Sequence, residues 1–102
     1  MNTVNKIKTQ IGPLKVYWAK DIKDDNNNSN MLGVFVPEKY EIAVLNNLPQ
    51  GIKRQTLLHE LIHMLQYNQG LKFNESTADA LATGLIHLID NNPKLVEFLT
   101  TK

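Results

Sequence analysis

Two histidines and a glutamate form the spacing His-Glu-x-x-His at His59, Glu60 and His63. On a helix, residues four apart lie nearly above one another, so both imidazoles point at one spot that can hold a metal ion. Glu60 lies at the edge of the same face, placed to take a proton from a metal-bound water. Because the chain has only three histidines, its composition gives little opportunity for an accidental match.

The residues around this motif predict a buried helix from about residue 53 to residue 69. At roughly 100° per residue, a wide apolar arc contains Leu57, Leu58, Leu61, Ile62, Met64 and Leu65. The opposite polar stripe contains Thr56, His59, His63, Gln66 and Tyr67. Buried imidazoles need polar partners, because an unpaired one is costly. We favour a metal ion as that partner; the alternative is two core histidines bonded to other side chains.

A third ligand is expected downstream, because a catalytic zinc site has three protein ligands and a position open to water. The candidates are Glu75, Asp79, His87 and Asp90. Glu75 opens the next predicted helix, and we assign it to the metal. Asp79, one turn on, is expected behind the site, accepting a hydrogen bond from the far ring nitrogen of a ligand histidine. The alternatives are a helix-terminal acid for Glu75 and a surface charge for Asp79, and we expect His87 to be solvated.

Length and composition predict one domain over residues 1–102, with enough hydrophobic residues, 42%, for a single core. The net charge is +1 and no run is strongly basic, which argues against a nucleic-acid partner. The chain has no cysteine, so a metal must be held by His, Asp and Glu. No stretch resembles a signal peptide or a membrane span, so we expect a soluble cytoplasmic protein.

Alternation of apolar residues predicts strands over residues 14–18, 31–36 and 40–44, the last two as a hairpin, and a weaker one within 4–11. Gly12-Pro13 indicates a turn, and Gly33 a bulge or a close backbone approach. The polar run from Asp21 to Asn30 predicts an exposed loop with nothing to bury.

Helix signals frame the second half of the chain. Pro49 suits the first turn of the motif helix, and Gly70 its C-cap. Asn74 suits the N-cap of a helix that ends at residues 91–92. A short helix over 93–99 follows, with Leu95, Val96, Phe98 and Leu99 as its packing surface. The fold class is α+β: a three- to four-stranded, mostly antiparallel sheet packed on the motif helix, a second ligand-bearing helix and a short C-terminal helix.

His59-Glu60-x-x-His63 followed by Asn74-Glu75-x-x-x-Asp79 resembles the signature of the gluzincin metallopeptidases. The compact arrangement is similar to the ImmA/IrrE-type enzymes, above all to small phage- and prophage-encoded relatives, in which a short sheet precedes a stretch like residues 55–63. The resemblance covers about residues 31–90, with a looser echo at 14–18. It implies a minimal zincin fold in a bacterial cytoplasm and one zinc per chain, with ligands His59, His63 and Glu75, Glu60 as general base, and Asp79 orienting His59.

The chain departs from the larger gluzincins in two ways. Only eleven residues separate His63 from Glu75, and there is no room for the separate lobe whose His or Tyr stabilises the oxyanion. Tyr67 is the candidate for that role, with Tyr17 and Tyr40 as weaker ones. The alternative for each is a packing tyrosine.

These features predict a zinc-dependent metalloendopeptidase acting on a protein or peptide, which would add as a strand to an edge formed by either strand of the hairpin. The alternative is a phage-type zinc-binding interaction or inhibitor protein on the same fold, which binds a partner without cleaving it. A third reading is a helical core with accidental histidine spacing. Two histidines and a carboxylate also suit Mn, Fe or Co. The substrate and the oligomeric state stay open.

Overall fold

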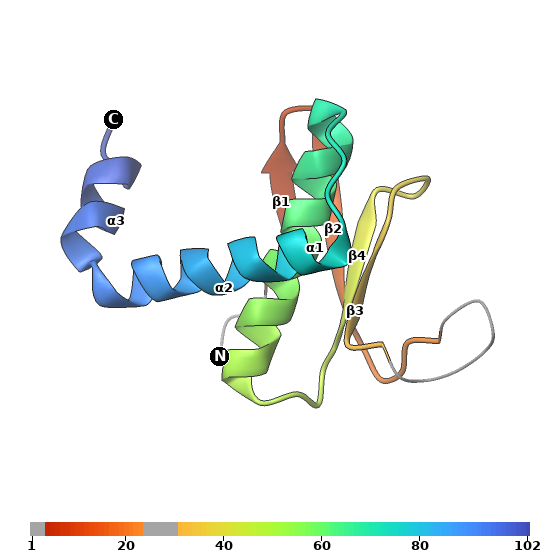
Figure 1. Ribbon diagram of the computed structural model, residues 1–102. Helices are drawn as coiled ribbons and strands as arrows, with labels where there is room; N and C mark the ends of the chain where they lie inside the picture. The colour runs from red at the N-terminus through yellow and green to blue at the C-terminus, as the bar shows by residue number, and fades with distance from the viewer. Residues whose placement is uncertain (1–3, 24–30) are drawn as a thin grey trace.

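The computed structural model describes residues 4–23 and 31–102 and has an α+β fold (Figure 1). Four strands come first in the sequence, and three helices follow. The elements are β1 (Lys6–Thr9), β2 (Gly12–Ala19), β3 (Gly33–Val36), β4 (Glu41–Leu45), α1 (Gln50–Gln69), α2 (Glu75–Asn91) and α3 (Pro93–Thr100). The predicted α+β class and the three predicted helices are confirmed.

The strands form one sheet in the order β1-β2-β4-β3. β1 pairs with β2 and β3 with β4 in antiparallel hairpins, as predicted for β3 and β4. The central pair, β2 with β4, is parallel, with Val16 opposite Ile42, so the sheet is mixed. This order makes β3 an outer strand and places β4 inside the sheet, which settles which strand of the hairpin has a free edge.

The predicted turn at Gly12-Pro13 is wrong by two residues. The turn lies at residues 10–11, and Gly12, with φ of 136°, already begins β2. Pro13 lies opposite Lys8 of β1, and pairing with β4 starts only at Lys15. The missing N–H of Pro13 therefore interrupts no ladder on the β4 side.

The core has two parts, one on each side of α1. Leu14, Ile42 and Val44 of the sheet pack with Met64 of α1. On the other side of the helix, Ile62 packs with Ala78 and Ala82 of α2. Helix α1 is thus the middle layer between the sheet and α2 (Figure 1), which is why its sequence is apolar over a wide arc.

The helices α1 and α2 begin and end at the capping residues predicted from the sequence, or next to them. Gly70 adopts the left-handed conformation, φ 68°, and its N–H bonds back to the last turn of α1. The Asn74 side chain accepts a hydrogen bond of 2.8 Å from the N–H of Thr77. Pro49 stands directly before α1, at the N-cap position rather than within the first turn. The caps at Gly70 and Asn74 bound the short connection that brings α2 back across α1.

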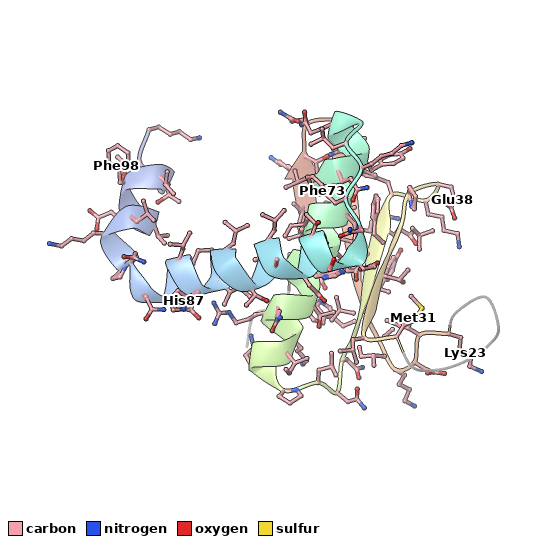
Figure 2. All side chains as sticks on the ribbon, in the orientation of Figure 1. Lys23, Met31, Glu38, Phe73, His87 and Phe98 are labelled. Carbon is pink, nitrogen blue, oxygen red and sulfur yellow. The ribbon has the colours of Figure 1, made fainter. Side chains whose placement is uncertain are left out.

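Two expectations about burial are wrong. Ile22 is 7% exposed and belongs to the core, although it lies in the run predicted to bury nothing; residues 24–30 of that run lie outside the described residues. The predicted packing surface of α3 is uncovered, with Phe98 77% and Leu99 70% exposed. Within the described ranges α3 contacts only α2, which carries it away from the sheet and α1 (Figure 2). None of the helices in the described part of the chain is both long and apolar enough to cross a membrane.

Candidate metal centre

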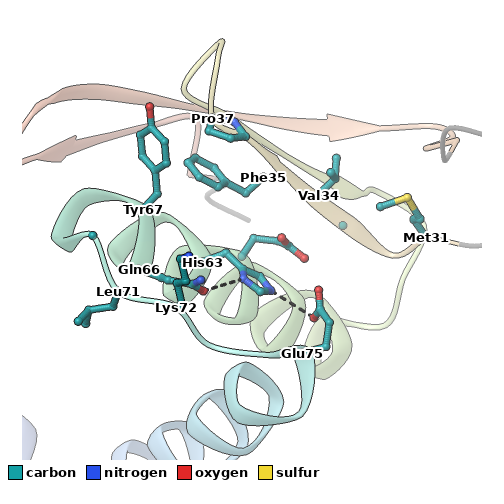
Figure 3. Close-up of a pocket in the computed structure, with 13 residues that line it drawn as sticks. Met31, Val34, Phe35, Pro37, His63, Gln66, Tyr67, Leu71, Lys72 and Glu75 are labelled. Atoms are coloured by element: carbon teal, nitrogen blue, oxygen red, sulfur yellow. Dashed lines mark hydrogen bonds and ion pairs between the residues drawn. The ribbon is translucent and has the colours of Figure 1, made fainter.

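Helices α1 and α2 bring three side-chain atoms into one tight triangle. Nε2 of His59 lies 3.1 Å from Nε2 of His63, because the two rings are one helical turn apart on α1. Oε2 of Glu75, the first residue of α2, lies 2.8 Å from the His59 nitrogen and 3.2 Å from the His63 nitrogen. Figure 3 shows His63 and Glu75 facing each other across this point. The three residues form a group that could hold a metal ion.

Both rings are held from behind by an oxygen acceptor. Nδ1 of His59 lies 2.7 Å from Oδ1 of Asp79, one turn along α2 from Glu75. Nδ1 of His63 lies 3.4 Å from Oε1 of Gln66 on its own helix (Figure 3). An acceptor at Nδ1 favours the tautomer that carries its proton there. Each neutral ring then directs the lone pair of Nε2 at the centre of the triangle.

The charges in this arrangement call for a cation. With its proton on Nδ1 toward Asp79, neutral His59 presents a lone pair to a Glu75 carboxylate oxygen 2.8 Å away. Two acceptors at that distance repel each other unless a positive charge lies between them. A second proton on each ring would supply it, and so would one metal ion that all three atoms share.

The size of the triangle fits zinc. With zinc-to-nitrogen and zinc-to-oxygen distances near 2.0–2.1 Å, two ligands of a tetrahedral site lie about 3.3 Å apart. The three sides measured here, 2.8, 3.1 and 3.2 Å, are close to that edge length. Two imidazoles and one carboxylate are also a ligand set that zinc uses when a fourth position stays open to solvent. The residues present therefore fit the metal.

Glu60 is the buried acid of the site, 8% exposed. Burial raises the pKa of its carboxyl above the ordinary 4.5, although the charges of His59 and His63 and a hydrogen bond with the Phe35 backbone oppose the rise. This residue lines the same hollows as the triangle. A carboxylate with a raised pKa beside a cation-binding point has the chemistry of a general base.

Glycine at position 33 allows β3 to lie directly over Glu60. A Cβ on Gly33 would stand 2.6 Å from Cγ2 of Thr56 and 3.3 Å from Cγ of Glu60. This is the close backbone approach that the sequence offered as one of two explanations for the glycine. The contact of strand on helix is therefore part of how the site is assembled.

Glu75 is the exposed acid, with 77% of its side chain open to solvent. Partial desolvation raises the pKa of Glu75, but in the metal-free state the hydrogen bonds and the charges of protonated His63 and His59 rings outweigh this and hold the pKa below the ordinary 4.5. Glu75 is therefore ionised and available as a ligand at neutral pH.

A hollow opens on each side of the triangle, and together they follow the free edge of β3. One, of about 510 Å³, extends past His63 to Phe35, Tyr67, Leu71 and Lys72 (Figure 3). The other, of about 400 Å³, extends past His59 to Leu32, Ile52 and Thr56. Both are lined by Met31, Gly33, Glu60 and Glu75. The site is thus the middle of a groove that a chain could cross.

The other candidate residues lie outside the triangle of His59, His63 and Glu75. The ring of Tyr67 packs edge-on against Phe35 at 5.7 Å, and Figure 3 shows its hydroxyl directed away from His63 and Glu75. The hydroxyl of Tyr40 bonds to Thr9 and Asn68, and that of Tyr17 to Glu41. The contacts of Tyr40 and Tyr17 agree with the packing alternative. Tyr67 is 53% exposed and lines the hollow beside His63, and its role in stabilising an oxyanion stays a prediction. His87 is exposed on α2, as expected, and Asp90 pairs with Arg54.

Two residues of the site were not assigned a role from the sequence. Gln66 was placed on the polar stripe of α1, and its position three residues after His63 is the signal that could have identified it as a ring acceptor. Phe35 contributes through its backbone, which no pattern of side chains reveals.

Comparison of the chain with protein-family models, with curated proteins and with solved structures finds no match.

Proposed function

We propose that this protein is a zinc-dependent metalloendopeptidase with a minimal zincin fold, similar to the ImmA/IrrE-type gluzincins. The observation that carries the proposal is the convergence of His59, His63 and Glu75 on one point, with the buried acid Glu60 beside it. A purely structural metal site does not require a further buried carboxylate beside its three ligands. A hydrolytic site needs one.

In this proposal His59, His63 and Glu75 bind the zinc, and Asp79 and Gln66 fix the two rings through Nδ1. Zinc bound there supplies a water of lowered pKa and polarises a carbonyl oxygen. Glu60 takes one proton from the attacking water as its oxygen bonds to the peptide carbon. Glu60 then gives that proton to the amide nitrogen as the carbon–nitrogen bond breaks, so that it ends the cycle ionised again.

The free edge of β3 is the surface on which a peptide would lie. Leu45 N–H donates to the Leu32 carbonyl, and Gly33 is opposite Val44. In an antiparallel ladder this alternation turns the backbone groups of Gly33 and Phe35 away from β4. The Phe35 N–H already donates to Glu60, so the backbone groups of Gly33 and the Phe35 carbonyl are the ones that a substrate strand would use, running between the two hollows.

The proposal is tested by incubating the zinc-supplemented protein with a mixture of fluorescence-quenched peptides, beside Glu60→Gln. We expect cleavage by the parent and a loss of at least about 100-fold in the variant, with zinc content unchanged. Glu97→Gln, the same change on α3, is the matched control and should cleave like the parent. Cleavage retained by Glu60→Gln would refute the assigned base. Zinc binding without cleavage of any peptide would favour a binding or inhibitor protein instead.

A further inference from the structure

The part of α2 from Leu81 onward and the whole of α3 form an arm with a large uncovered apolar surface. Seven large apolar residues, each 40–77% exposed, make up this arm surface: Leu81, Leu85, Leu88, Ile89, Leu95, Phe98 and Leu99. Seven such residues within one stretch of chain exceed the single exposed apolar residues that are normal on a monomer's surface. Figure 2 shows Phe98 at the far end of the arm, away from the sheet.

Helix α3 in particular needs a partner that the described chain does not provide. It has eight residues, and within the ranges 4–23 and 31–102 it contacts only α2. Isolated helices shorter than about 12 residues are marginal in water even with favourable sequences. The apolar side of α3 therefore has to be covered for the helix to persist.

We propose that a second copy of this chain covers the arm surface, giving a two-fold symmetric dimer. Leu81, Leu85 and Leu88 recur at intervals of four and three residues and fall within about 60° of the α2 circumference, the pattern of a helix-packing seam. From residue 80 to residue 89 the chain has no Asp, Glu, Lys or Arg. An uncharged apolar seam is complementary to itself, as a two-fold interface requires.

The area agrees with this occupant. A stable interface of standard size buries about 800 Å² per partner, and seven large apolar residues exposed to 40–77% would supply a substantial part of one. The dimer would also brace the far end of the helix whose first two turns carry Glu75 and Asp79, while leaving the groove along β3 open. The inference does not depend on the proposed enzymatic function, because no residue of the arm surface is in the metal centre.

The test is sedimentation equilibrium of the full chain over a concentration series, with Leu88→Glu and His87→Glu as a matched pair. Both variants place a carboxylate on exposed positions of α2, but position 87 lies about 100° round the helix, off the seam. We expect the parent to reach twice the 11.6 kDa of one chain. Leu88→Glu should raise the dissociation constant at least about tenfold, since each copy would bury an unpaired carboxylate in an apolar interface, and His87→Glu should leave it unchanged.

Leu99→Glu, at a residue 70% exposed, repeats the test on α3 should Leu88→Glu disturb folding as judged by circular dichroism. A parent that stays monomeric at every concentration would overturn the proposal and leave the arm to another protein. A dimer that persists unchanged in Leu88→Glu and Leu99→Glu would overturn it as well, and would point to pairing through the edge of β3.

Discussion

The two halves of α2 have similar periodicity and opposite surroundings. In the first half, Ala78 and Ala82 are fully buried against α1, and Glu75 and Asp79 reach the histidines beside them. In the second half, Leu85 and Leu88 are 42% and 48% exposed. The small residues let α2 approach α1 closely enough for short carboxylate side chains to reach the rings. Leu88 lies off the face of α2 that carries Ala78 and Ala82, and both leucines are exposed, so they are available for another molecule.

The α2 residues that position the metal centre are therefore different from the exposed apolar residues of the same helix. The contact between α1 and α2 is short and close, because it depends on two alanines and on three histidine–carboxylate pairs. A bidentate pair between Arg54 and Asp90, 2.6 and 3.2 Å, extends the contact toward the far half on the polar side of α2.

Replacing Glu75 by alanine should remove the largest contribution of the first half of α2 to zinc binding. Loss of a ligand should lower zinc affinity by more than about 100-fold, the upper range for loss of an outer partner alone. Competition with a chromogenic chelator measures the affinity, and Glu97→Ala on the exposed α3 is the control that should bind zinc like the parent. Equal affinity in Glu75→Ala and the parent would mean that the third ligand is another residue.

Asp79→Asn should have the next largest effect, because the amide no longer presents an anionic acceptor to Nδ1 of His59. Zinc affinity should fall about 10- to 100-fold. Asp90→Asn makes the same substitution in the far half of α2, where the carboxylate contacts Arg54 and not the histidines. It should leave zinc affinity unchanged, and a similar loss in both variants would refute a specific role for Asp79.

Ala82→Leu should destabilise the fold by about 1–3 kcal/mol, because added side-chain volume cannot fit between α1 and α2. Leu85→Ala, one turn on, should change the stability of the dissociated chain by no more than about 0.5 kcal/mol. Urea unfolding at a concentration where the chain is monomeric compares the two. A larger effect of Leu85→Ala than of Ala82→Leu would reverse the assignment of the buried and open halves.

The smallest effect is expected from the pair of Arg54 with Asp90. Hydrogen bonding and the charge of Arg54 hold the pKa of Asp90 below its ordinary 3.8. The stability that this pair contributes is therefore present above that ordinary pKa and is lost as the pH falls through the lowered value of the folded state. Thermal unfolding of Arg54→Met against the parent should show a small difference at neutral pH that shrinks on acidification and with added salt. A difference that grows on acidification would contradict this sign.

The site was more predictable from the sequence than the sheet. Helical spacing alone relates His59 to His63 and Glu75 to Asp79, because residues one turn apart share a face. The parallel pairing of β2 with β4 joins segments 26 residues apart, Lys15 with Glu41, and nothing local encodes it. The free edge of β3 follows from that pairing, so it too appeared only in the structure.

Periodicity also failed at α3 for a physical reason. It shows which side of a helix is apolar, but it contains no information on what covers that side. Leu95, Phe98 and Leu99 were therefore predicted to pack, and the structure leaves them exposed. Gly33 shows the converse, since a single glycine in a strand pattern did indicate the close approach of β3 to α1.

The most direct test of the metal centre is the metal content of the purified, untagged protein, measured by elemental analysis. The convergence of two imidazoles and a carboxylate on one point predicts one zinc per 11.6 kDa chain. Protein that contains no metal and takes up none from added zinc would contradict the account. It would mean that two protonated imidazoles satisfy Glu75 and Asp79, and that His-Glu-x-x-His here is a feature of the core.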